Sequence, residues 1–231
     1  MATKRQHVYA ISNILNQGPR SDDSRISNRL IAHFLNMSRG LLLKRRMDRK
    51  HSMSDANYLT YCDTLVPSKF FDCDCIPEEF NCLILRSTKV IPDYISSQDG
   101  VSIEVRNPFS GELIDYASLS SSKLAKHSLA SSDTPTWFIH NKHLYLTHTL
   151  TLDKVIIRLI PEDPEALKKY QSCEGSSTIC YDPEDDNYPI DTDLVQPMYS
   201  LTLEMLAKSY QFPQDDENNS KASVINNDKE V

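Results

Sequence analysis

The sequence predicts an α+β fold: an N-terminal helical hairpin with a long amphipathic helix, a β-hairpin or small-sheet domain, and a C-terminal helix with a flexible tail. Three observations lead to this prediction. Apolar residues recur at helical spacing around residues 30–42 and again around residues 198–206. Short β-type runs separated by turn residues fill the stretch between them. The end of the chain is polar and lacks periodicity, which is typical of a flexible tail.

The N-terminal hairpin is predicted from two amphipathic segments and the loop between them. Residues 3–16 carry one apolar face, and Gly18 and Pro19 are suited to end that helix. Ser27 stands where an N-cap is needed, because its hydroxyl can accept from the free N–H groups of a first turn. The second helix then extends to about Lys50, where a basic run opposes the helix dipole. We assign residues 1–52 to this hairpin.

Residues 53–170 are expected to form the β-rich domain. The alternating run 101–105, the turn Asn107–Gly111 and the return 112–116 predict one hairpin, which could project as a finger. The run 137–146 predicts a second hairpin held in register by aromatic and aliphatic cross-strand pairs. Residues 154–160 are rich in β-branched side chains and predict a further strand.

The remaining chain divides into residues 171–212, an acidic arm followed by a helix, and residues 213–231, the flexible tail. That helix is expected over Pro197–Tyr210, because Pro197 suits the first helical position. The net charge of −7 hides an asymmetry, since residues 1–50 hold eleven basic and three acidic residues, and residues 171–231 hold three and thirteen. The basic and acidic ends are either two solvated faces or complementary surfaces of neighbouring subunits.

Motifs of the common enzyme classes are absent from the sequence. With five glycines there is no phosphate-binding GxxxxGK[ST] or GxGxxG loop, and HExxH and GxSxG are missing as well. We therefore predict no catalytic residues, no cofactor and no resident metal. No apolar run reaches the roughly 18 residues of a membrane span, and no signal peptide is expected at the N-terminus.

Several weaker readings stay open. Cys62, Cys73, Cys75 and Cys82 do not have zinc-site spacing and are expected to be ordinary thiols, although a metal is the alternative. Cys173 and Cys180 could close a small disulfide loop. Two groups could also bind a metal or a divalent cation, but turn-flanking or solvated polar residues are the simpler reading. They are the histidines His140, His143 and His148, and the acidic group Asp182, Glu184, Asp185, Asp186, Asp191 and Asp193.

Six segments carry a family resemblance. They are ILNQGP, SDDSRIS, RLIAHFLNMSRGLLLKR, NCLILRSTKVIPDYI, WFIHNKHLYL and VIIRLIPEDPEAL, which together span roughly residues 7 to 170. The layout resembles the ring or adaptor proteins of the head–tail connector in crAss-like tailed bacteriophages. The match is one of helix, turn and strand order, and none of the six segments is a chemical signature.

The resemblance implies a structural virion protein without catalysis. It would form a homododecameric ring below the portal protein, assembled in the host cytoplasm, and would extend the DNA channel toward adjacent ring or tail proteins. Genomic DNA would pass close by without specific contact, and no membrane is involved. The alternatives are a tail or receptor-recognition module that uses its β-hairpins, and a hydrolase with a metal at the histidines or cysteines.

Two groups of residues are the predicted partner interface. In the basic end of the long helix they are Arg39, Arg45 and Arg46, which could also contact nucleic acid non-specifically. In the last helix they are Met198, Leu201, Met205 and Tyr210, which by analogy with tail adaptors would clamp the portal or a neighbouring subunit. The competing interpretation is that this apolar stripe packs on the chain's own core.

Overall fold

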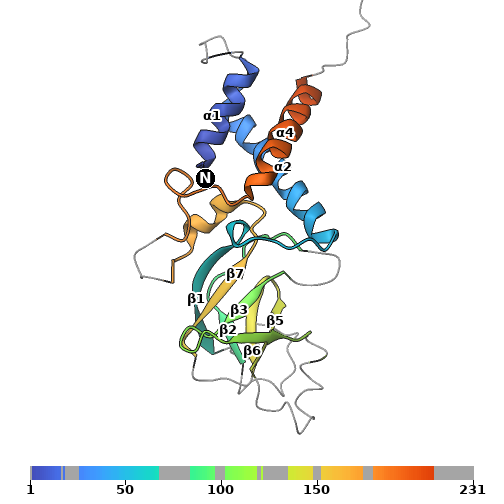
Figure 1. Cartoon of the computed structure of the whole chain (residues 1–231). Coiled ribbons are helices and arrows are strands. Elements are labelled where there is room, and N and C mark those ends of the chain that lie inside the picture. Colours follow the sequence, from blue (N-terminus) through green and yellow to red (C-terminus); the bar gives the residue numbers. More distant parts are fainter. Residues whose placement is uncertain are drawn as a thin grey trace, which may run out of the picture.

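A computed structural model describes residues 2–16, 18, 26–67, 84–96, 102–118, 121, 135–147, 152–173 and 179–210. In this part of the chain, three α-helices stand on one end of a seven-stranded barrel (Figure 1). The helices are α1 (Lys4–Leu15), α2 (Asn28–Asp48) and α4 (Val195–Tyr210). The strands are β1 (Leu59–Pro67), β2 (Ile84–Ser87), β3 (Glu104–Arg106), β4 (Leu113–Tyr116), β5 (Thr136–His140), β6 (His143–Thr147) and β7 (Lys154–Leu159). Short 3₁₀ turns are η1 (Asp55–Asn57), η4 (Pro164–Lys169) and η5 (Thr192–Leu194).

The barrel corrects the predicted fold class. The strand order β1-β2-β6-β5-β4-β3-β7 is closed by six residue pairs between β1 and β7, from Leu59↔Leu159 to Thr64↔Lys154. The prediction of a small sheet with hairpins is therefore wrong. Both expected hairpins exist, as β3–β4 and β5–β6, but they are parts of one closed wall. The pairings that close the wall join residues up to a hundred positions apart, or pair β4 with β5 in parallel, and local sequence patterns do not encode them.

The barrel encloses its own hydrophobic core. Inward-facing residues come from alternate positions of the strands, as the burial of Tyr61, Val105, Leu144 and Ile157 shows. Trp137 of β5 belongs to this core, and its indole N–H donates to the Ile114 carbonyl of β4 at 2.9 Å. Closure leaves no open sheet edge along the paired strands, which removes the usual route to edge-to-edge aggregation.

Local capping explains where the first two helices begin. Thr3 caps α1 in a capping box with Gln6, since each side chain accepts from the other residue's backbone N–H. The predicted N-cap Ser27 is confirmed, because its hydroxyl accepts from the Leu30 N–H at 3.2 Å. Arg45 and Arg46 lie in the last turn of α2, where cations stabilise the negative end of the helix.

The C-terminal helix packs on the N-terminal pair, which is the second correction to the fold class. Val8, Ile11, Ile31, Leu35, Met198 and Leu206 share one buried cluster drawn from α1, α2 and α4. The two ends of the chain therefore build one helical unit, and an N-terminal helical hairpin describes only part of it. The four predicted segment boundaries stay a prediction.

A smaller cluster joins the helical unit to the barrel. Leu43 from α2 packs with Ile95 and Ile160 at the upper rim of the barrel, and Met47, Met53, Tyr58 and Leu194 cover them. Among the described residues, no helix has the length and apolar character needed to cross a membrane.

Candidate assembly surfaces

Arg39 lies at the junction of the helical unit and the barrel and has no exposed surface. Its guanidinium donates to the carbonyls of Pro189 and Pro161, both at 2.7 Å, and more weakly to that of Asn57 at 3.5 Å. Burial lowers the pKa of Arg39, yet an arginine stays protonated in proteins. Arg39 was predicted to contact a partner, but its donors already bind three separate segments of its own chain.

The sequence itself indicates that Arg39 lies on the buried face of α2. Arg39 follows Ile31 and Leu35 at intervals of four, so it continues the buried face of α2. Its charge instead led to the prediction that Arg39 belongs to the exposed basic end.

Arg46 extends the same junction. Its guanidinium lies 3.2 Å from the Asp191 carboxylate and 2.8 Å from that of Asp193. Asp191 also accepts from the Asn57 side-chain amide at 2.7 Å and from the Ser54 hydroxyl. The basic end of α2 thus pairs with acidic residues that lead into α4. Part of the charge asymmetry between the two ends of the chain is therefore neutralised within one subunit.

Arg45 differs from the other two predicted arginines because its side chain is exposed. Within the described ranges it forms no ion pair, although its charge lowers the pKa of Glu204 on α4 after the larger effect of Lys208. Arg49 is likewise exposed one turn further along. These two cations are available to a partner of negative charge.

The predicted contact residues of α4 fall into two groups. Met198 is fully buried in the helical core, in agreement with the competing interpretation for that position. Leu201 and Met205 are half-buried, and Met205 contacts α2, because the Ser38 hydroxyl donates to its sulfur at 3.6 Å. Tyr210 ends the helix, and its side chain lies outside the described part.

An apolar strip on α2 was missed from the sequence. Met37 and Leu41 lie one turn apart and keep 44% and 38% of their surface exposed. Both flank Ser38, which also accepts from the Thr202 hydroxyl at 3.0 Å and so marks the contact line with α4. We define the α2–α4 patch as Met37, Leu41, Leu201 and Met205. The spacing of Leu30, Phe34, Met37 and Leu41 is a second helical stripe beside the buried one, and it was the available signal.

The predicted finger is the turn between β3 and β4. Phe109 at its tip is 81% exposed, the largest exposure among the described large hydrophobic residues. The Asn107 carboxamide oxygen accepts from the Phe109 N–H at 2.9 Å, and the Gly111 N–H donates to the Asn107 carbonyl at 2.9 Å. Gly111 has φ of 72°, a conformation that glycine adopts without strain. The turn therefore presents its aromatic ring on a fixed backbone.

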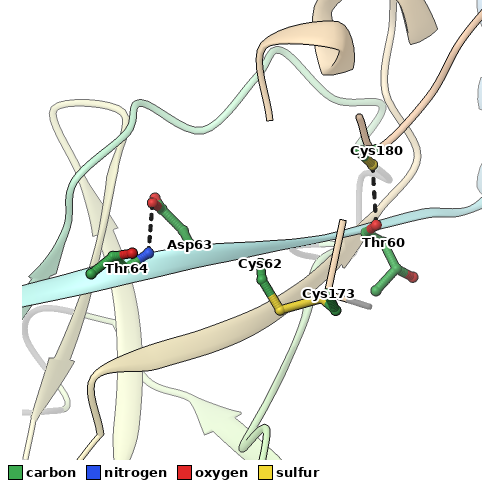
Figure 2. The surroundings of a disulfide bond; sticks show 6 residues. All are labelled: Thr60, Cys62, Asp63, Thr64, Cys173 and Cys180. Carbon is green, nitrogen blue, oxygen red and sulfur yellow. Dashed lines mark hydrogen bonds between the residues drawn. A yellow bond between two sulfur atoms is a disulfide. The ribbon is translucent and has the colours of Figure 1, made fainter. Parts of the chain in front are cut away.

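The cysteine pairing differs from the prediction, in which Cys62 is an ordinary thiol and Cys173 could pair with Cys180. Cys62 on β1 forms a disulfide with Cys173, so the alternative pairing of Cys173 with Cys180 is wrong (Figure 2). Cys180 remains a free thiol that donates to the Thr60 carbonyl at 3.1 Å, and burial raises its pKa to about 11. Such a thiol is a poor nucleophile at neutral pH. The disulfide fastens the segment after η4 to the outside of β1.

The described part of the chain contains no group of three metal-binding side chains. His140 and His143 flank the β5–β6 turn, and the His143 Nδ1 atom lies 3.1 Å from the Ser87 carbonyl oxygen. The third histidine, His148, and Cys73, Cys75 and Cys82 lie outside the described residues.

Sequence comparison indicates the class of protein to which these surfaces belong. It is the class of structural ring proteins of phage tails, which assemble through contacts between their surfaces. The family described as "Phage tail ring protein 2" matches residues 6–229, and the chain belongs to this family. A similar protein is Ring protein 2 of Bacteroides phage crAss001, which is 27% identical over 215 residues that cover 87% of this chain and 89% of the relative. The resemblance to crAss-like ring proteins is thereby confirmed. The chain is a ring component of a phage virion, and its family is a structural one.

Proposed function

We propose that this chain forms one ring of the head–tail connector, bound below the portal and continuing the DNA channel into the tail. The observation that carries the proposal is the match to a tail ring family over nearly the whole chain. We propose a dodecamer, on the premise that this ring shares the symmetry of the portal it adjoins. The net charge of −7 suits a channel wall that does not hold the passing duplex.

The helical unit is the part proposed to contact the portal or an adjacent ring. The α2–α4 patch places four apolar side chains on its surface, and Arg45 lies beside it next to Glu204. Apolar centres with charged rims are typical of protein interfaces. By the same proposal, the barrel faces the next ring or tail protein, and no catalysis takes part.

Native mass spectrometry of this chain mixed with the portal protein of the same phage tests the proposal. We expect a complex with about twelve copies of the chain per portal ring. The chain measured alone shows whether the portal is needed to template the ring. Failure to bind the portal, with binding to a tail protein, would place the chain in a lower ring and contradict the proposed position.

The exposed Phe109 turn favours a second candidate, a tail or receptor-recognition module. In that case the barrel hairpins carry the contacts, and the helical unit is scaffold. Replacing Phe109 with Ser in the phage and measuring adsorption to host cells separates the two. Normal adsorption with defective assembly would refute the second candidate.

A further inference from the structure

A groove on the outer side of α1 has no established role. Its volume is about 980 Å³, at the upper end of the roughly 300–1,000 Å³ typical of ligand pockets. The floor is formed by Val8 and Ala32, with the Tyr9 ring beside them, 60% exposed. One wall comes from η4 and from residues 183–184.

The rim of the groove is cationic. Arg5 on α1, Arg29 in the first turn of α2 and Lys168 on η4 are all exposed. Within the described ranges none of these three is held by an ion pair. Lys4 is already neutralised, because its ammonium group lies 2.8 Å from the Glu165 carboxylate. Glu184 adds one negative charge to the rim, which therefore keeps a net positive charge. An apolar floor with a cationic rim fits a peptide that carries an apolar side chain next to acidic residues.

The chain itself contains such a peptide beyond α4. Residues 211–231 begin with QFPQDDE. Phe212 and Pro213 are followed, after Gln214, by three consecutive acidic residues. The whole segment has five acidic and two basic residues. The family match extends to residue 229, so this segment belongs to the sequence shared with the ring family.

The proposed ring places a second copy of this segment beside each subunit. Residues 211–231 span up to about 70 Å when extended, several times the roughly 10 Å width of a helix. The segment is therefore long enough to reach the groove of a neighbouring copy.

We infer that the α1 groove binds the acidic C-terminal segment, residues 211–231, of the neighbouring copy in the ring. The segment and the groove are two different surfaces, so their contact between copies is head-to-tail, and such a contact forms a ring when the rotation between copies closes. The inference rests on the proposed ring and names the arm that links its subunits.

The binding test uses the full-length chain with its own acids neutralised, D215N/D216N/E217Q. The probe is a fluorescent peptide of residues 211–231 with the natural sequence, followed by anisotropy. We expect saturable binding that weakens as salt rises from about 0.05 to 0.5 M. Adding R5E/R29E to the host chain should weaken binding at least tenfold. The matched control R45E/R49E makes the same change of charge elsewhere and should leave affinity within twofold.

Absence of saturable binding, or equal affinity for the R5E/R29E chain, would overturn the inference. A second measurement identifies the copy. A photo-reactive phenylalanine analogue at position 212 is incorporated into an equal mixture of ¹⁵N-labelled and unlabelled full chains. Cross-links between differently labelled chains, at residues 3–12 or 165–168, are expected. Cross-links within one chain would overturn the second-copy assignment.

Failure of this inference is distinguishable from failure of the proposed function. If native mass spectrometry shows rings on the portal and the peptide does not bind the groove, the arm is wrong and the ring stands. If the peptide binds the groove and no ring forms on the portal, the proposed position in the virion is wrong.

Discussion

The helical unit and the barrel are stabilised in different ways. The barrel is built from one continuous stretch of chain. Its strands are hydrogen-bonded in the order β1-β2-β6-β5-β4-β3-β7, and β7 pairs with β1 to close the wall. The helical unit gathers both ends of the chain, and a polar network around Arg39, Arg46 and Asp191 joins it to the barrel rim. Closure through backbone pairing tolerates side-chain changes on the outer face. The junction combines a small apolar cluster with the buried cation Arg39, and loss of that cation would leave buried carbonyl groups unpaired.

The Arg39→Ala substitution should have the largest effect. It leaves buried carbonyl groups of Pro161 and Pro189 without donors, and it opens a cavity between α2 and the barrel. The expected loss is about 3–5 kcal/mol of unfolding free energy. Thermal and denaturant unfolding of the purified chain measures it. Arg45→Ala is the matched control, because Arg45 is exposed and its loss should cost under about 0.5 kcal/mol. Equal effects of the two substitutions would refute the role assigned to Arg39.

The Cys62→Ser substitution tests the barrel side of the comparison. The disulfide joins residues 111 positions apart, so breaking it frees a long loop in the unfolded chain. We expect a loss of about 2–4 kcal/mol, measured as a lower unfolding midpoint. Reductant should lower the stability of the natural chain and leave the variant unchanged. Cys180→Ser keeps the disulfide and should retain the response to reductant, and loss of that response would show a different pairing.

Acidification should weaken the helical unit through His7. Burial lowers the pKa of His7, which lies against Tyr188 and Tyr199 in the helical core. The unfolded chain then binds a proton below about pH 6.5 that the folded chain resists, so stability falls as pH drops through that value. Each unit by which folding lowers the pKa costs about 1.4 kcal/mol at low pH. Denaturant unfolding at a series of pH values measures the loss.

The control for this titration is His7→Gln, which keeps a polar side chain beside Tyr199 and cannot titrate. Its stability should vary less between pH 7 and pH 5 than that of the natural chain. The same pH dependence in both proteins would show that His7 is not the responsible group.

The sequence predicted the parts that depend on near neighbours. The Ser27 cap, the Asn107–Gly111 turn and the β5–β6 hairpin are each formed within a few residues, and each was predicted correctly. The contacts between distant segments were not predictable in this way. β1 pairs with β7 across most of the barrel sequence, and Cys62 pairs with Cys173, which is 111 positions away. Periodicity contains no information about such partners.

The charge pattern of α2 did not indicate which of its arginines are exposed, because exposure depends on contacts with distant segments. Three arginines at one end of a helix suggested one exposed surface, but Arg39 is buried, Arg46 is paired and Arg45 is exposed. What separates them is the helical face on which each lies. The apolar strip at Met37 and Leu41 was missed because Leu41 was assigned to a single core stripe and Met37 was not assigned to any stripe.

The smallest change in stability, and the sharpest contrast in function, is expected for two exposed apolar pairs. M37Q/L41Q alters the α2–α4 patch, and F109Q/L113Q alters the outer face of the β3–β4 hairpin. Because all four side chains are exposed, each pair should change the unfolding free energy by under about 0.5 kcal/mol per residue. If the helical unit carries the portal contact, M37Q/L41Q should lower the number of copies bound per portal in native mass spectrometry, and F109Q/L113Q should leave it unchanged. The reverse result would assign the portal contact to the barrel, and the helical unit would then face the tail.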